Sequence, residues 1–103
     1  MYYVYVLRSL KDTGFYTGFT DNLKRRIKEH NNKQEPSTKF RVPFELIYFE
    51  GCISKKDAIA REKYLKTGRG KRYLKYRLNS YLKDLGDGGV PRTKSMRSFI
   101  ENS

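Results

Sequence analysis

Two aromatic runs near the N-terminus constrain the fold more than any other feature of this sequence. Residues 2–8 are rich in Tyr and Val, and a second run follows at residues 15–19. The segment between them ends in Gly14, which favours a turn, so the pair predicts an antiparallel β-hairpin. Side chains alternate along a strand, which places Tyr16 and Gly18 on one face of the second strand. Gly18 also indicates a close approach to its backbone.

A short basic helix is expected directly after the hairpin, capped by the Thr or the Asp at positions 20–21. Leu23 and Ile27 stand four residues apart, as on the buried face of a helix. Arg26 and His30 are also four apart, and they fall on the edge beside that face. Both side chains are therefore expected to face the hairpin.

The middle of the chain predicts a loop over residues 31–42 and a third strand over residues 44–50. The strand is apolar enough to be central or covered by helices, and Gly51 is expected to end it. A hydroxyl residue followed three positions later by an acid then predicts a second helix over residues 54–67. This second helix is expected to end at Gly68.

Glu62 interrupts the apolar stripe of this second helix. Ala58 and Leu65 are related as positions i and i+7, and Glu62 is the i+4 position between them. An unpaired buried charge is strongly unfavourable, so the carboxylate needs a partner. That partner is either a nearby Lys or Arg or a metal ion.

A third helix is predicted from Gly70 onward. Its buried side is expected to consist of Tyr73, Leu74, Leu78 and Tyr81. Between residues 61 and 77 the chain has eight Lys or Arg residues and one acid, Glu62. Cations interleaved with Tyr suit phosphate contacts and base stacking.

The charge of the whole chain supports the same class of partner. Its 103 residues carry 23 Lys and Arg against 11 Asp and Glu, a formal net charge of +12. Such a charge on a small domain is typical of proteins that bind phosphate polyanions. Nucleic acid is favoured over a membrane surface, because the sequence has no apolar run of spanning length.

These patterns predict one α+β domain over residues 1–83, a small three-stranded antiparallel β-sheet packed with three α-helices. Residues 84–103 are rich in glycine at their start and have no period, so we expect a flexible C-terminal tail. The sequence has one cysteine, Cys52, and starts without a signal-peptide pattern. We therefore expect a cytoplasmic protein with no disulfide-linked partner. The sequence leaves the oligomeric state open.

Five side chains form the candidate functional set: Tyr5, Tyr16, Arg26, His30 and Glu62. Each also has an ordinary structural explanation. The tyrosines can serve sheet packing, Arg26 can be a solvated charge, and His30 can be a helix cap. An ion pair would account for Glu62.

Four blocks of sequence, in order and at compatible spacing, carry a family resemblance. They are Tyr-Val-Tyr at 3–5, Tyr-Thr-Gly at 16–18, and the longer blocks at 23–30 and 58–65. Together they resemble the GIY-YIG endonuclease family, and within it the small single-domain bacterial members. The resemblance covers about residues 2–80.

The resemblance implies a function for each of the five candidates. Tyr5 and Tyr16 would be the motif tyrosines, Arg26 and His30 would line the active site from the first helix, and Glu62 would bind one divalent ion, Mg²⁺ or Mn²⁺. Phosphodiester hydrolysis needs an activated water and cations on the developing charge. The sequence does not decide which of these groups is the general base.

The resulting hypothesis is a metal-dependent endonuclease that acts on nucleic acid, preferably DNA, with low sequence specificity. Family members add a late Asn to the site, and Asn79 is the available candidate. The alternative is a non-catalytic basic nucleic-acid-binding module, and a structural adaptor is a third option. Under both of the first two hypotheses, the candidate nucleic-acid contacts are Lys39, Arg41, Lys66, Arg69, Lys71 and Arg72.

Overall fold

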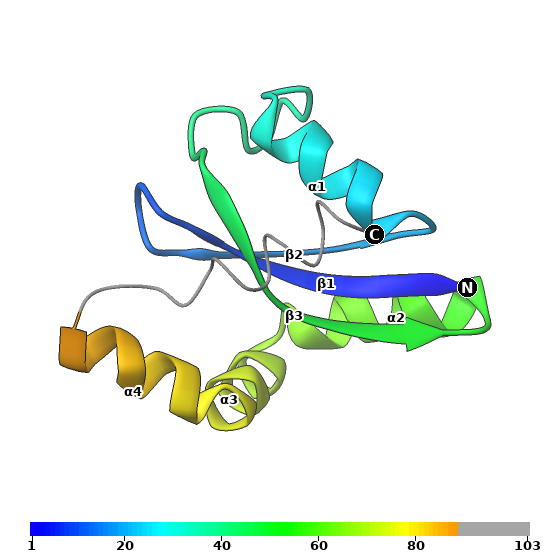
Figure 1. Cartoon of the computed structure of the whole chain (residues 1–103). Coiled ribbons are helices and arrows are strands. Elements are labelled where there is room, and N and C mark those ends of the chain that lie inside the picture. The colour runs from blue at the N-terminus through cyan, green and yellow to red at the C-terminus, as the bar shows by residue number, and fades with distance from the viewer. Residues whose placement is uncertain (89–103) are drawn as a thin grey trace.

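A three-stranded antiparallel sheet forms the centre of the protein (Figure 1). The structure is a computed structural model, and it describes residues 1–88. The strands are β1 (Tyr2–Ser9), β2 (Phe15–Thr20) and β3 (Phe44–Cys52), in the order β2-β1-β3. The hairpin partner β2 therefore lies at one edge, and β1 is the central strand. The predicted sheet is confirmed, with the apolar β3 at an edge.

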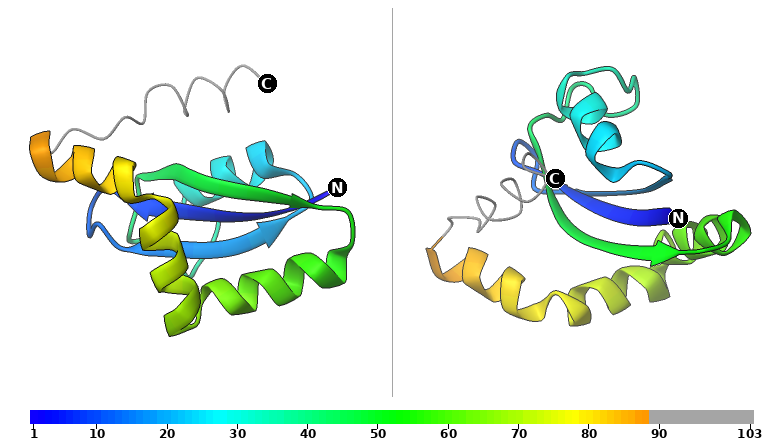
Figure 2. Two further views of the ribbon diagram at one scale, coloured as in Figure 1. Left: turned by 90° about the horizontal axis from the view of Figure 1, so that it is seen from below. Right: turned by 45° about the vertical axis from the view of Figure 1, so that its right-hand side comes forward.

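Four helices pack on the two faces of this sheet: α1 (Leu23–Asn31), α2 (Lys55–Leu65), α3 (Gly68–Arg77) and α4 (Asn79–Gly88). Helix α1 covers one face, and α2, α3 and α4 lie on the opposite side (Figures 1 and 2). The α+β prediction holds, but the number of helices was wrong. Leu78 leaves the helical conformation at the C-cap of α3, which divides the third predicted helix in two.

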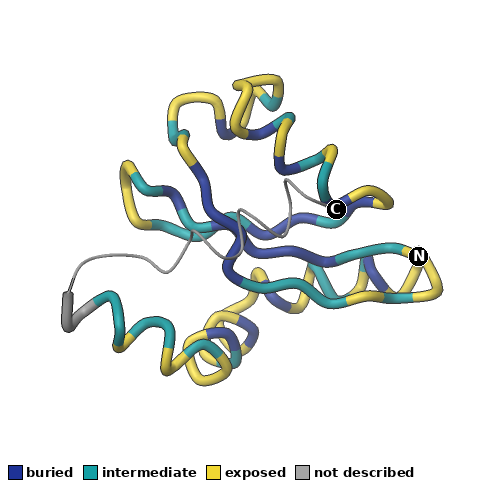
Figure 3. Tube along the Cα trace, in the orientation of Figure 1, coloured by how far each residue is buried: buried dark blue, intermediate teal, exposed yellow. Residues whose placement is uncertain are grey.

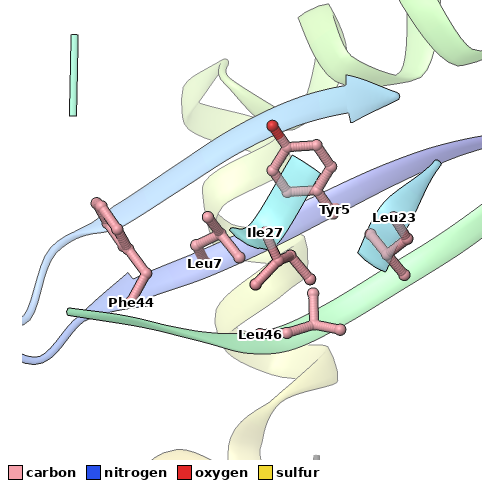
Figure 4. Close-up of a cluster of buried hydrophobic side chains, with 6 residues drawn as sticks. All are labelled: Tyr5, Leu7, Leu23, Ile27, Phe44 and Leu46. Atoms are coloured by element: carbon pink, nitrogen blue, oxygen red, sulfur yellow. The ribbon is translucent and has the colours of Figure 1, made fainter. Parts of the chain in front are cut away.

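Each face of the sheet carries its own buried cluster, and the central strand contributes to both. Much of this strand is coloured as buried in Figure 3. On the α1 side the cluster consists of Tyr5, Leu7, Leu23, Ile27, Phe44 and Leu46 (Figure 4). On the α2 side it consists of Val4, Val6, Ile47, Ala58, Leu65 and Leu74. Alternation along β1 produces this division, because successive side chains point to opposite faces.

Three predicted helix and strand boundaries were wrong. The N-cap of α1 is Asn22, whose side chain accepts the Arg25 backbone N–H at 3.0 Å. Gly51 does not end β3, because it pairs with β1 and the strand continues to Cys52. Gly68 begins α3 instead of stopping α2, since the Thr67 side chain caps the new helix.

The expected boundary between domain and tail falls inside a helix. Helix α4 runs on to Gly88, past residue 83. Residues 89–103, which make up most of the predicted tail, lie outside the described residues. Within residues 1–88, no helix combines the length and the apolar character needed to cross a membrane.

Candidate active site

Tyr5 is the centre of the candidate site and is 1% exposed. It belongs to the cluster under α1, but its hydroxyl points away from the apolar side chains around it (Figure 4). Tyr5 pairs with Gly18 across the hairpin. A Cβ at Gly18 would lie 2.5 Å from the Tyr5 hydroxyl oxygen, so the Tyr5 ring requires glycine at this position. This is the close backbone approach that the sequence indicates.

His30 is fully buried and bonds to groups on both sides of its ring. Its Nε2 lies 2.9 Å from the Tyr5 hydroxyl, and its Nδ1 lies 2.8 Å from the Thr38 hydroxyl. The ring also packs edge-on against Tyr16, with centroids 4.9 Å apart. His30 is therefore a component of the interior rather than a helix cap. Thr38 has no counterpart among the sequence candidates, because it lies in a loop without a periodic pattern.

The direction of these hydrogen bonds follows from what each group can donate. The Thr38 hydroxyl has one proton, which it donates to the backbone carbonyl of Glu35 at 3.5 Å, so it acts as an acceptor toward His30. Nδ1 therefore carries the ring proton and donates it to Thr38. Nε2 is then the acceptor of the Tyr5 hydroxyl proton. We therefore assign His30 as the Nδ1–H tautomer.

The environment keeps both His30 and Tyr5 neutral at pH 7. Burial, and then the charge of Arg26, lower the pKa of His30 to about 4. Burial raises the pKa of Tyr5 to about 12, although Arg26 opposes the rise, and the charge of Glu62 adds to it.

Arg26 is held between the cluster and two carboxylates. Its guanidinium donates to Glu35 Oε2 at 2.6 Å and to Glu29 Oε1 at 3.1 Å. Burial would lower its pKa, but these bonds and the interaction with Tyr5 outweigh burial and raise it. The guanidinium is thus permanently charged and fixed in direction. Glu35 lies in the same loop as Thr38 and was not among the residues predicted from the sequence.

Glu62 reaches the site from α2 on the other side of the sheet. Its side chain is 18% exposed, and Lys66 Nζ donates to its Oε1 at 3.0 Å. The expected Lys partner is therefore present. The predicted stripe is also present, because Ala58 and Leu65 are buried on either side of Glu62.

Glu62 would be a single protein carboxylate for the divalent ion that the family resemblance implies. Among the described residues, no group of three or more His, Cys, Asp or Glu is arranged to hold a metal. Mg²⁺ commonly uses one or two carboxylates and completes its shell with water and phosphate oxygens. Lys66 is half exposed, and an exposed pair of this kind contributes only about 0–1 kcal/mol, so its ammonium can give way.

Helix α2 is fixed to the sheet by the residue before Glu62. Arg61 donates to both carboxylate oxygens of Glu50 on β3. Its Nε lies 2.9 Å from Oε1 and 3.1 Å from Oε2, and its Nη2 lies 2.9 Å from Oε2. Its guanidinium also stacks on the Tyr64 and Tyr73 rings, 5.2 and 4.9 Å from their centroids. This contact sets the position of the helix turn that presents Glu62. Nothing in the sequence distinguishes Arg61 from the many cations around it.

The six candidate nucleic-acid contacts occupy two regions. Lys39 and Arg41 lie in the loop after α1, where Arg41 Nε donates to Asp12 Oδ2 at 2.6 Å. The other four, Lys66, Arg69, Lys71 and Arg72, are exposed around the junction of α2 and α3. Asn79 is exposed at the start of α4 and lines a pocket beside α3. Tyr16 lines the same pocket.

The sequence of this chain matches that of a known catalytic domain. A sequence model of the GIY-YIG catalytic domain matches residues 1–77. The chain belongs to the GIY-YIG family. This is a family of nucleases, so the substrate class is nucleic acid.

Proteins similar to this chain occur in several bacteria. The UPF0213 protein of Clostridium perfringens is 48% identical over 67 residues, which are 64% of this chain and 71% of that protein. The UPF0213 protein of Staphylococcus saprophyticus is 37% identical over 75 residues, covering 72% of this chain and 90% of that protein. The solution NMR structure of the UPF0213 protein from Bacillus halodurans is 38% identical, covers 72% of this chain and 82% of that one, and superposes with a TM-score of 0.45. None of these names states an activity.

Proposed function

We propose that this GIY-YIG protein is a metal-dependent endonuclease that hydrolyses phosphodiester bonds in nucleic acid, preferably DNA, with low sequence specificity. One observation carries the proposal. The buried Tyr5 hydroxyl lies 2.9 Å from Nε2 of His30, on the same helix that presents the Arg26 guanidinium. This hydrogen bond supports a proton path, and Glu62 on α2 is the carboxylate to which the proposal assigns the metal.

Arg26 is proposed to bind the scissile phosphate. Its planar guanidinium has five donors, and the bonds to Glu29 and Glu35 use only part of them. Those two carboxylates also hold the Arg26 guanidinium in one orientation, which lowers the conformational entropy lost when phosphate binds. Arg26 then stabilises the negative charge that develops on the equatorial oxygens.

Tyr5 and His30 are proposed to move the proton of the attacking water. Because the pKa of Tyr5 is about 12, its hydroxyl is protonated at pH 7 and cannot act as a pre-formed phenolate. It can accept a proton from water only as it passes its own proton to Nε2 of the neutral His30, 2.9 Å away. The negative charges of Glu35 and Glu29 stabilise the imidazolium formed this way. Tyr16 packs on the His30 ring and positions it.

Glu62 is proposed to hold a divalent ion, Mg²⁺ or Mn²⁺, against the phosphate. When bound, such an ion polarises the phosphate and stabilises the leaving oxygen. The side chain has the partial exposure that a substrate-facing ligand needs. Lys66 is then displaced from Oε1 and is free to contact the nucleic-acid backbone.

The proposal is tested by cleavage of labelled single-stranded, duplex and branched DNA and RNA, with and without Mg²⁺ or Mn²⁺. Glu62→Gln should abolish metal-dependent cleavage while binding of the same substrates survives. Asp57→Asn is the matched control, because it removes one exposed carboxylate from the same helix. Equal cleavage by wild type and Glu62→Gln would contradict the metal site.

A second pair of variants tests the proton path. Tyr5→Phe removes the hydroxyl that bonds to His30, whereas Tyr16→Phe leaves that bond in place. We expect the larger loss of cleavage rate, about 10²-fold or more, in Tyr5→Phe. A larger loss in Tyr16→Phe would assign proton transfer to Tyr16.

The second candidate is a nucleic-acid-binding module without catalysis, and the Glu62–Lys66 bond favours it. This ion pair satisfies the carboxylate with no metal present. Binding of nucleic acid with no cleavage in any metal would establish this alternative.

A further inference from the structure

A pocket of about 880 Å³ lies on the helical side of the hairpin, and the chemistry proposed above does not use it. It is bounded by β2 and the preceding turn, by the end of α2, and by α3 and α4. Figures 1 and 2 show α3 and α4 at the end of the sheet where the hairpin turns. The pocket therefore extends from the edge strand β2 toward the last described helix.

The pocket lining combines an apolar interior with cations. Phe15, Leu74 and Leu82 contribute apolar surface. Four cations share the lining: Arg8, Lys66, Lys71 and Lys75. Its described lining residues include no Asp or Glu. An occupant that matches this lining has a flat or apolar part and several negative charges.

The pocket shares residues with the surroundings of the candidate active site. Residues 15–17 of β2 line it, and Tyr16 among them packs on the His30 ring. Lys66 also lines it, and this side chain bonds to Glu62 one helical turn earlier, roughly 6 Å along the axis of α2. A nucleic-acid strand with a phosphate at Glu62 is therefore within reach of the pocket.

We propose that this pocket binds a nucleotide of the substrate strand next to the scissile phosphate, with its base out of the stack. The base packs on Phe15, Leu74 and Leu82, and the flanking phosphates contact Lys66, Lys71 and Lys75. Contacts of a base with an apolar or aromatic surface do not depend on base identity, which is consistent with low sequence specificity. The inference rests on the proposed function only in naming this strand as the one that is cut.

A binding measurement that needs no cleavage tests the site. Fluorescence anisotropy compares an eight-nucleotide oligothymidylate with an oligomer of equal length and charge in which every nucleotide is abasic. Wild type should bind the base-bearing strand about tenfold more tightly, given the contribution of one seated base. Leu82→Trp fills the pocket and should remove most of this preference. Equal affinity of wild type for the two oligomers would overturn the proposal.

Charge reversal provides a second test on exposed residues. One double variant, Lys71→Glu and Lys75→Glu, reverses two charges in the pocket lining. The control double variant, Lys63→Glu and Arg77→Glu, makes the same change in net charge at exposed residues outside the lining. The first pair should lose about tenfold more affinity for oligothymidylate than the second pair. Equal losses would show a general charge effect and would exclude the site. If wild type shows the predicted binding but cuts no nucleic acid, the pocket stands and the proposed catalysis fails.

Discussion

At the scale of single residues, the contact between Tyr5 and Gly18 determines whether the candidate site can form. The Tyr5 ring crosses the hairpin directly over Gly18, where a Cβ would lie 2.5 Å from the hydroxyl oxygen and 2.7 Å from Cζ. Neither backbone nor ring can easily move, because Tyr5 belongs to the buried cluster under α1. The hydroxyl that bonds to His30 therefore depends on glycine in the neighbouring strand.

Gly18→Ala should displace the Tyr5 hydroxyl and reduce cleavage at least about tenfold, with a loss of about 1–3 kcal/mol in folding stability. The control is Gly51→Ala in β3, where the nearest atom to a new Cβ is the sulfur of Met1, a 63% exposed terminal side chain that can move. Cleavage rates and denaturant unfolding of both variants provide the comparison. Wild-type cleavage by Gly18→Ala would show that the Tyr5 position is not needed.

His30 makes a further prediction about pH. Its pKa is lowered from 6.5 to about 4, so between these values the unfolded chain binds a proton that the folded chain does not. The contribution of His30 to stability is thus complete above about pH 6.5 and is lost as the pH falls toward 4. The loss is at most about 3 kcal/mol. His30 is the only histidine in the sequence.

The measurement is denaturant unfolding at pH 7 and pH 4.5 for wild type and His30→Gln. Wild type should lose more stability than the variant over this interval, because only wild type carries the titrating ring. Parallel losses in the two proteins would mean that His30 is not buried in its neutral form.

At the scale of secondary-structure elements, the periodic parts of the fold could be predicted from sequence. Alternation placed Tyr16 and Gly18 on one face of β2, and i, i+4 spacing identified Leu23 and Ile27 as the buried side of α1. The same spacing placed Arg26 and His30 beside that stripe. These predictions succeeded because period and burial are directly linked.

The loop after α1 could not be predicted in the same way. Glu35 fixes Arg26, and Thr38 bonds to His30, although neither residue belongs to a periodic pattern. Their contacts depend on how the loop folds back over the end of α1. The break at Leu78 is also a tertiary effect, since the apolar spacing continues through it.

The cap of α1 was difficult to predict for a different reason, because positions 20, 21 and 22 all carry side chains that can cap a helix. Asn22 is the residue that caps α1 in the structure.

Asn22→Ala should destabilise the protein by about 1 kcal/mol, because it removes the side chain that accepts the Arg25 backbone N–H. The thermal midpoint should fall by about 4–8 °C. Asp21→Ala removes only an exposed ion pair with Arg25, so a smaller change is expected. An equal fall in the two midpoints would contradict this assignment of the cap.

At the scale of the whole molecule, the cations behind the net charge of +12 differ in how freely they can pair with the phosphates of a nucleic acid. Arg26, Arg41 and Arg61 are each bonded to carboxylates. Lys71 and Lys75 are instead exposed in the lining of the pocket. The pocket beside β2 therefore carries cations that can replace counterions on a strand.

This distribution predicts how binding responds to salt. Each phosphate contact adds about −0.7 to −0.9 to the slope of log K against log salt, so about four contacts give a roughly hundredfold loss of affinity between 50 and 200 mM. Lys71→Gln should reduce the magnitude of the slope by nearly one contact. Arg41→Gln should change it less, because Asp12 already offsets that charge at 2.6 Å. Anisotropy titrations of an oligonucleotide at several salt concentrations measure all three slopes. A larger change in Arg41→Gln than in Lys71→Gln would move the binding surface from the pocket to the loop after α1.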